Sequence, residues 1–390
     1  MFLREKYLSK IRPFYDVDLI KVITGIRRCG KSVVLRQIID EIKEKGVRED
    51  HIIYMNVESK EYTDIRNDDL YKYIKSKMVD QDKYYIFLDE IHRVTKWELA
   101  VNSFKADYGD KVSLFVTGSN SDLLSGEYAT HLVGRYVSFK IYPFTFQEVC
   151  EYKNILDKYE LKPYFDEYML WGGMPQRFVL TDEEQVKTYL SDVYDSIVVK
   201  DIVERFKITN LDLFNRIIEY IVTIPSQTFS AESLSKYFES NDRNVTKNTI
   251  YNYLEYMCTA FLISKAERYD IRGKRILNGK YKYYLTDLGL GQIMNTSRKY
   301  QLGAYLENIV YNELISRGYD VKVGNIENKE VDFIATRYQE KVYFQVVYQL
   351  NDENMEREFG VFQKISDHYP KYVISIDTID MSQNGILHKN

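Results

Sequence analysis

The chain has 390 residues, of which 45% are hydrophobic and 29% are charged, and its formal net charge is −4. This composition excludes a disordered chain and a uniformly basic nucleic-acid-binding protein, and the length predicts two or three domains. The three cysteines, Cys29, Cys150 and Cys258, are odd in number and far apart, which excludes a disulfide framework and a metal motif and fits a reducing compartment.

The first predicted elements surround the sequence GIRRCGKS, residues 25–32. The apolar run DLIKVIT before it predicts a buried strand, and apolar residues at helical spacing after it predict an amphipathic helix that Gly46 ends. The match to G-x-x-x-x-G-K-[ST] indicates a loop whose backbone amides wrap a phosphate at a helix N-terminus. Lys31 would reach the β- and γ-phosphates of ATP, and Ser32 would hold Mg²⁺. The predicted nucleotide-binding residues are Gly25, Ile26, Arg27, Arg28, Cys29, Gly30, Lys31, Ser32 and Val33; the alternative is a chance turn before a helix.

A second buried strand ends in two acids, in the sequence KYYIFLDEIHRV at residues 83–94. A parallel sheet would carry Asp89 to its carboxyl edge, where open α/β sheets bind their ligands. Asp89 would support the Mg²⁺, and Glu90 would polarise the attacking water as a general base. The alternative is an ordinary strand followed by a helix-capping acid.

A third apolar strand, VSLFVTGSN at residues 112–120, ends in small polar residues that belong at the same edge. Ser119 and Asn120 could contact the γ-phosphate or the attacking water. Further on, Arg135 precedes another strand, and an arginine there could complete the positive charge around the phosphate. The alternative for Arg135 is a solvated cation at a helix end.

Together, ITGIRRCGKS, YIFLDEIHRV, FVTGSN and LVGRYVSFKIYPFTFQEV resemble an AAA+-type P-loop ATPase over residues 1–145. The likeness is to the clade of signal-transducing prokaryotic ATPases with a fused nuclease-like domain. It implies the strand order 5-1-4-3-2, a sensor at Asn120 or Ser119, and an arginine finger at Arg135 that acts on its own site or a neighbour's. It also implies an ATPase domain over residues 1–150.

The middle of the chain predicts helices over residues 151–225, with a turn at WGGMP, residues 171–175. Two helices and a basic hairpin over residues 226–298 predict a winged helix. Its candidate DNA-phosphate contacts are Lys247, Arg272, Lys274, Arg275 and Lys280. The alternative is a winged helix that binds protein and has a solvated wing.

The last module, residues 299–390, predicts a helix, three strands, a further helix and a final strand, and resembles the PD-(D/E)XK nuclease (restriction-endonuclease-like) fold. The resemblance assigns its two acids to Glu307 and Asp332, which with the Gln345 amide oxygen could hold a metal ion as a degenerate site. The motif's lysine is replaced by Val347, so we expect no nuclease activity. Lys341 or Lys364 could substitute from elsewhere in the chain.

The sequence therefore predicts an α/β protein with an AAA+-like parallel sheet, a helical and winged-helix middle, and a C-terminal nuclease-like domain. Its expected activity is ATP hydrolysis with ATP and Mg²⁺ bound, coupled to the later domains. A non-hydrolysing nucleotide switch, an interaction scaffold and an ATP-gated DNA nuclease are the alternatives. DNA, a protein partner and self-association stay open, whereas the absence of a signal peptide or an apolar run of ~20 residues predicts a cytoplasmic protein without membrane contact.

Overall fold

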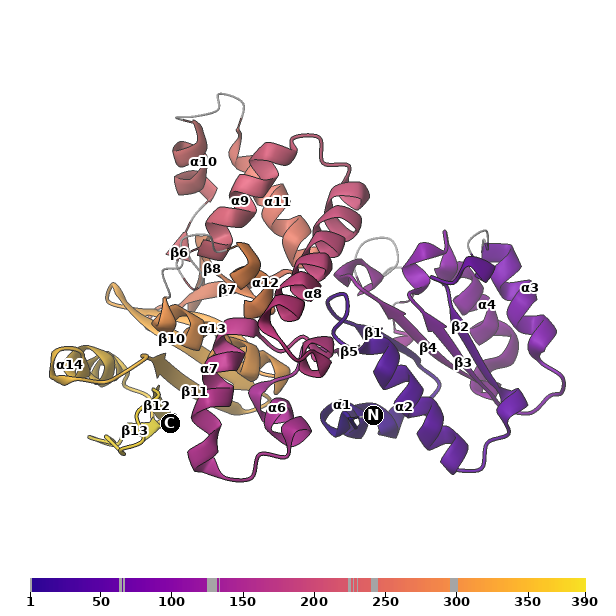
Figure 1. Ribbon diagram of the computed structural model, residues 1–390, viewed down its shortest axis with the longest axis horizontal. Coiled ribbons are helices and arrows are strands. Elements are labelled where there is room, and N and C mark those ends of the chain that lie inside the picture. The colour runs from indigo at the N-terminus through magenta and orange to yellow at the C-terminus, as the bar shows by residue number, and fades with distance from the viewer. Residues whose placement is uncertain are drawn as a thin grey trace. The chain divides into compact units, whose positions relative to one another are not determined.

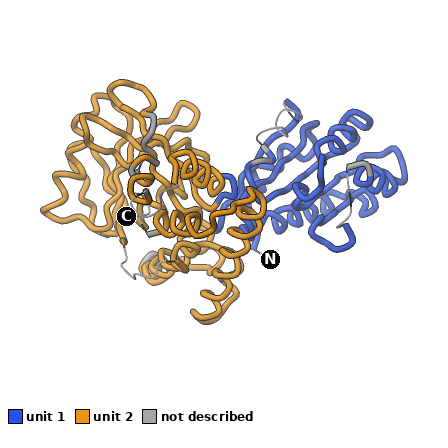
Figure 2. Tube along the Cα trace, turned by 90° about the horizontal axis from the view of Figure 1, so that it is seen from above, with its two compact units in different colours: residues 1–143, 259–261 blue, residues 144–258, 262–390 orange. Residues whose placement is uncertain are grey.

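The computed structural model describes residues 2–62, 65, 67–124, 132, 134–223, 226, 228–229, 231–239, 245–294 and 301–390. The chain forms two compact units (Figure 2). The first contains Met1–Pro143 and Thr259–Phe261, and the second contains Phe144–Cys258 and Leu262–Asn390. The predicted divisions at residues 225 and 298 fall inside the second unit and stay predictions.

A five-stranded parallel sheet forms the centre of the first unit (Figure 1). Its strands lie in the order β2-β3-β4-β1-β5, which confirms the predicted order 5-1-4-3-2. Every residue of the three inner strands is buried, as the apolar runs in the sequence predicted. The strands are β1 (Ile20–Thr24), β2 (Ile52–Asn56), β3 (Tyr84–Asp89), β4 (Val112–Gly118) and β5 (Tyr136–Lys140).

Helices connect these strands and cover the sheet. Helix α2 leads from the inner strand β1 to the edge strand β2, whereas α3 and α4 lead back toward β1. Right-handed crossovers therefore place α2 on one face of the sheet and α3 and α4 on the other (Figure 1). The helices are α1 (Glu5–Ile11), α2 (Lys31–Glu44), α3 (Asn67–Lys77) and α4 (Trp97–Tyr108). A 3₁₀ turn over Ser121–Leu124 follows β4, and residues 125–131 lie outside the described residues.

The second unit contains an eight-stranded mixed sheet in the order β13-β12-β11-β10-β9-β7-β8-β6. Strand β7 pairs in parallel with β9, so one sheet joins the predicted winged-helix hairpin to the predicted nuclease-like module. The strands are β6 (Thr228–Phe229), β7 (Ile263–Asp270), β8 (Arg275–Leu285), β9 (Asp320–Ile326), β10 (Lys329–Arg337), β11 (Glu340–Val346), β12 (Lys371–Ile374) and β13 (Leu387–Lys389).

Helices make up most of the remainder of this unit. They are α6 (Phe146–Lys153), α7 (Leu161–Trp171), α8 (Glu183–Ser196), α9 (Leu211–Thr223), α10 (Ala231–Glu239), α11 (Lys247–Thr259), α12 (Leu288–Met294), α13 (Leu302–Ser316) and α14 (Asp352–Gly360). Helix α8 continues as a π-helix over Ile197–Glu204. None of the helices in the described part of the chain has the length and apolar character that crossing a membrane requires.

The WGGMP turn, where α7 ends, is fixed by a buried carboxylate. The Gly173 amide donates to Asp287 Oδ2 at 2.6 Å, and burial raises the pKa of Asp287 to about 6. Gly172 has φ +67°, and a Cβ atom there would lie 2.1 Å from Asp287 Oδ1. Residue 172 must therefore be glycine for this turn to close on Asp287.

Candidate functional site

The loop between β1 and α2 is the predicted phosphate-binding loop. Its backbone turns through left-handed conformations at Gly25 (φ 151°), Arg28 (φ 67°) and Gly30 (φ 105°). A Cβ atom at Gly25 would lie 2.2 Å from the Ile141 carbonyl oxygen, so only glycine fits there. Gly30 provides no side-chain cap for α2, which leaves amides at the helix N-terminus for an anion.

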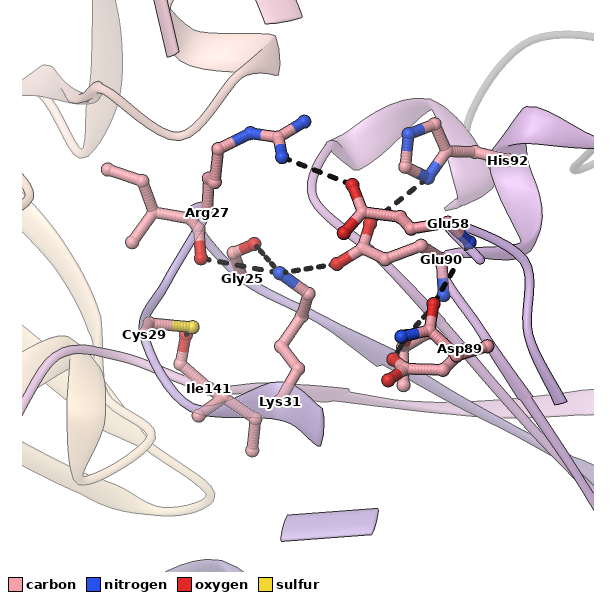
Figure 3. Close-up of polar contacts among 12 residues, drawn as sticks. Gly25, Arg27, Cys29, Lys31, Glu58, Asp89, Glu90, His92 and Ile141 are labelled. Carbon is pink, nitrogen blue, oxygen red and sulfur yellow. Dashed lines mark hydrogen bonds and ion pairs between the residues drawn. The ribbon is translucent and has the colours of Figure 1, made fainter. Parts of the chain in front are cut away.

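Lys31 lies at the centre of this loop and is almost fully buried. Its Nζ donates to the carbonyl oxygens of Gly25 (3.1 Å) and Ile26 (3.4 Å) and lies 3.3 Å from Glu90 Oε1 (Figure 3). Burial by itself lowers the pKa of Lys31, but the negative groups around it, of which Glu90 contributes most, together outweigh burial, and the pKa is raised overall. The lysine is therefore held charged, in position to exchange its protein partners for phosphate oxygens.

The two acids at the carboxyl end of β3 are fixed by hydrogen bonds with neighbouring strands. The Thr117 hydroxyl donates to Asp89 Oδ1, and the Tyr54 hydroxyl donates to Asp89 Oδ2 at 3.0 Å. The Glu90 amide donates to Thr117 Oγ1 at 2.9 Å, and Glu90 itself is left-handed, with φ 56°. Burial raises the pKa of Glu90, but the charges of Lys31 and His92 outweigh burial and leave the pKa lowered.

Ser119 and Asn120 follow β4 beside the phosphate loop. Gly118, which precedes them, is paired with Thr24, which precedes Gly25. Ser119 and Asn120 are buried, and within the described residues Ser119 Oγ has no hydrogen-bond partner. An orphaned hydroxyl next to the predicted phosphate loop fits a site that is completed by phosphate and Mg²⁺.

Side chains that the sequence analysis did not single out line the rim of this site. Glu58 Oε1 lies 3.3 Å from Arg27 Nη1 (Figure 3). The same oxygen lies 2.7 Å from Arg93 Nη2. His92 Nδ1 lies 3.4 Å from Glu90 Oε2. In the sequence DEIH, His92 lies two residues after Glu90, and this spacing is the local signal that could have indicated their contact.

Buried contacts of Cys29 and Arg4 hold the loop in its conformation. The Cys29 thiol is fully buried and donates to the Ile141 carbonyl at 3.4 Å, and burial raises the pKa of this thiol. The buried Arg4 guanidinium donates to the Cys29 carbonyl at 3.0 Å. Ile26 is buried and Val33 is half-buried. The Cys29 side chain and the Arg4 contact therefore shape the loop, whereas the lysine and the acids provide its charges.

Arg135 does not lie with the other predicted site residues. Its carbonyl accepts a hydrogen bond from the Ile20 amide, and the strand pairing runs on from Ile20–Tyr136. Arg135 is therefore at the amino edge of the sheet, and the phosphate loop is at the carboxyl edge. Five residues of β1 separate the two edges, which is about 17 Å at ~3.3 Å per residue. The exposed Arg135 side chain is thus too distant for the charge role predicted in its own subunit's site.

A second polar cluster lies in the second unit around the predicted nuclease-like residues. Glu307 on α13 and Asp332 on β10 come together, and the sequence analysis missed two further members, Lys282 on β8 and Glu330 on β10. Burial raises the pKa of Asp332 well above its ordinary value, and the Glu307 charge raises it further. Burial also raises the pKa of Glu307, against the opposing effect of Lys282. Gln345 Oε1 accepts a hydrogen bond from the Asp332 amide at 3.3 Å.

The basic residues of the predicted winged helix mostly face acids of the same chain. Lys247 lies 3.1 Å from Glu232, Arg272 lies 2.9 Å from Glu327, and Arg275 lies 3.9 Å from Asp270. Lys274 is exposed, and the side chain of Lys280 lies outside the described residues. The winged-helix assignment itself stays a prediction.

Comparisons with known proteins agree with the fold of the first unit. Residues 18–150 match a family described as an AAA domain, and residues 162–300 match a domain of unknown function. The chain is similar to the Aeropyrum pernix ORC1 protein in complex with DNA, at 15% identity and a TM-score of 0.34, over 76% of this chain and 93% of that chain. This structural likeness is too low to carry an argument about function.

Two relatives match over most of their length. The chain is 37% identical to an uncharacterized protein of Haemophilus influenzae, over 96% of this chain and 93% of that protein. It is 33% identical to an uncharacterized protein of Methanocaldococcus jannaschii, over 88% of this chain and 78% of that protein. The chain therefore belongs to the same family as these two proteins, and residues 18–150 are its AAA domain, with the fold of a P-loop ATPase.

Proposed function

We propose that the protein hydrolyses ATP at the carboxyl edge of the five-stranded sheet and couples the reaction to its second unit. The observation that supports this most is the buried ion pair between Lys31 and Glu90, 3.3 Å apart, beside Asp89. It combines a cation for the β- and γ-phosphates with a carboxylate base in one place. Bound Mg²⁺ would neutralise phosphate charge, held by Ser32 and through water by Asp89.

In this proposal, different residues of the chain bind the phosphates, activate the attacking water and orient the reacting groups. The amides after Gly30 bind phosphate oxygens, and Lys31 leaves Glu90 to pair with the phosphates. Glu90, released from Lys31, then accepts a proton from the attacking water. The buried hydroxyl of Ser119 and the amide of Asn120 orient the γ-phosphate or that water.

Lys31→Ala tests the site. The loss of the cation should weaken ATP affinity by at least about tenfold, which corresponds to about 1.4 kcal/mol, and calorimetric titration with ATP and Mg²⁺ measures it. Lys45→Ala, an exposed lysine just after the same helix, is the matched control and should bind ATP as the wild type does. Unchanged affinity in Lys31→Ala would contradict the assignment of the phosphate loop.

The products that the protein releases distinguish the proposed ATPase from the alternative functions. Steady phosphate release distinguishes the proposed ATPase from a nucleotide switch that binds ATP without turnover. ATP-dependent and metal-dependent DNA cleavage would instead support an ATP-gated nuclease.

A proposal for Arg135 rests on its place at the opposite edge. We assign it to the ATP site of a neighbouring molecule, where its exposed guanidinium would stabilise charge on the transferred phosphoryl group. This assignment requires at least transient self-association of the chain.

DNA binding by the predicted winged helix is a further proposal. It rests on the exposed Lys274 and on surface ion pairs that contribute little and that DNA phosphates could displace. A DNA titration across salt concentration tests it. Binding that weakens steeply with salt supports phosphate contacts, and no binding at low salt favours a protein partner.

A further inference from the structure

The cluster of three carboxylates in the second unit (Glu307, Glu330 and Asp332, hereafter the carboxylate cluster) surrounds a buried ammonium group. Lys282 Nζ lies 2.6 Å from Glu330 Oε1, 2.9 Å from Glu307 Oε1 and 4.0 Å from Asp332 Oδ1. The lysine is only 4% exposed. Burial by itself lowers its pKa, but the three carboxylates outweigh burial and raise it, so the group is charged.

Lys282 comes from a part of the sequence that the nuclease-like resemblance does not include. It lies on β8, in the hairpin predicted as the wing, whereas Glu307 is on α13 and the other two acids are on β10. The two lysines that the sequence analysis considered as substitutes are engaged elsewhere. Lys341 pairs with Asp367 at 3.2 Å, and Lys364 pairs with Glu327 at 2.7 Å.

One oxygen atom on each of Asp332 and Glu307 already accepts a hydrogen bond from a neighbouring protein group. Asp332 Oδ2 accepts from the Val346 amide at 2.8 Å, and Glu307 Oε1 accepts from the Tyr284 hydroxyl at 2.8 Å. The Gln345 amide oxygen faces the Asp332 amide. In the portion of the chain that is described, the one group of three or more acidic, His or Cys side chains with ligand atoms all within 4.8 Å of one another is His51, Asp80 and Asp82. With Lys282 between them, the residues of the carboxylate cluster therefore do not fit a bound metal ion.

Three carboxylates this close together cannot all stay ionised in a buried site unless a cation compensates them. A divalent metal is one such cation, and an ammonium group is another. The two exclude each other here, because like charges within a few ångströms in a site of low dielectric constant repel strongly. Lys282 is fixed by its strand, so it is present whether or not metal is available.

We propose that the Lys282 ammonium is the resident cation of the carboxylate cluster, in the place where nuclease-like domains hold a divalent metal. The second unit then needs no metal at this position. The cluster instead joins hairpin β7–β8 to α13 and β10 by charge. The alternative is that Lys282 assists phosphodiester cleavage, which would require a metal ion beside it. The experiment below distinguishes the two.

Counting bound Mn²⁺ by electron paramagnetic resonance, on the full chain without nucleotide, tests the proposal. Wild type and Asp332→Asn should bind the same number of Mn²⁺ ions, because the wild-type carboxylate cluster takes none. Any weak Mn²⁺ binding at Ser32 and Asp89 is common to both proteins and cancels. A Mn²⁺ ion bound to wild type and lost in Asp332→Asn would overturn the proposal.

Lys282→Met, in contrast to wild type, should bind Mn²⁺ at the carboxylate cluster. Without its ammonium group the carboxylate cluster should bind one Mn²⁺ ion, with an affinity at least about tenfold higher than that of the same site in wild type. Mn²⁺ should therefore raise the unfolding temperature of this variant only. Lys282→Arg keeps the charge and is the matched control that should stay indifferent to Mn²⁺. A folded Lys282→Met that gains no Mn²⁺ contradicts the proposal.

If Lys282→Met does not fold with or without Mn²⁺, the comparison of wild type with Asp332→Asn decides alone. A cleavage assay adds an independent measurement. Single-stranded, duplex and branched DNA should remain intact with Mg²⁺ or Mn²⁺, with or without ATP. Metal-dependent cutting that Asp332→Asn abolishes would overturn the proposal and make Lys282 a candidate catalytic lysine.

Discussion

Glu90→Gln tests the ion pair at the centre of the proposed ATP site. Glu90 Oε1 and Lys31 Nζ are 3.3 Å apart, and the two side chains are 12% and 3% exposed. Two unit charges at this distance attract by about 5 kcal/mol at an effective dielectric constant of about 20. Removing one partner of a buried pair costs about 3–5 kcal/mol. Because Lys31 keeps its two carbonyl acceptors and glutamine can still accept a hydrogen bond, we expect a loss of about 2 kcal/mol, below that range.

This loss has three measurable consequences. The unfolding temperature of the nucleotide-free protein should fall by about 4–8 °C. ATP should bind up to about tenfold more tightly, because Lys31 no longer has to leave Glu90 before it pairs with phosphate. Phosphate release should nevertheless slow by about 10²–10⁴, because the proposed general base is gone. Thermal unfolding, calorimetry and a phosphate assay measure these quantities.

The pH dependence of the same pair has a definite sign. The folded protein holds the pKa of Glu90 below its ordinary value of 4.5, so the stabilisation is present above that pH and is lost as pH falls through the lowered pKa. The stability difference between wild type and Glu90→Gln should therefore shrink under acid conditions. Glu58→Gln, which leaves the Lys31–Glu90 pair intact, is the control. Wild-type stability and ATP affinity in Glu90→Gln would refute the energetic argument, and wild-type phosphate release would show that Glu90 is not the base.

Two further predictions follow from the first unit. Arg135→Ala should slow phosphate release by about 10³ or more, and mixing it with Lys31→Ala should restore release, since each variant supplies the group that the other lacks; no recovery would exclude action on a neighbour's site. Burial lowers the pKa of Lys21 to about 7, so the unfolded chain binds more protons between that pH and the ordinary pKa of 10.5, and wild-type stability should rise with pH in this window. Lys21→Met should lack this rise in thermal unfolding measured from about pH 7 to about pH 9, and an equal rise in both proteins would show that Lys21 is not the titrating group.

The arrangement of the proposed ATP site was largely predictable because its signals are local. Gly25 to Ser32 form one continuous motif, and apolar runs bring Asp89 and Ser119 to strand ends, where a parallel sheet gathers them at one edge. The order of the strands came from a family resemblance, and the structure confirms it. In each case the residues that matter are neighbours in the sequence, or their positions follow from the strand that carries them.

The partners of those residues could not be predicted, because they come from elements far apart in the chain. Thr117 and Tyr54 reach Asp89 only through the pairing of β3 with β4 and with β2, and a threonine or tyrosine in a strand gives no periodic signal of that contact. The distance of Arg135 from the phosphate loop likewise depends on which end of β5 lies beside which end of β1.

Lys282 is the clearest case of a role that only the tertiary structure decided. In the sequence it is one of several cations in a hairpin and is indistinguishable from a solvated lysine. Its burial and its contact with Glu307 depend on α13 packing beside β8, and its contact with Glu330 depends on the sheet that joins the hairpin to β10. Side-chain charge is written in the sequence, but whether water or three carboxylates surround that charge is determined by the long-range packing of strands and helices.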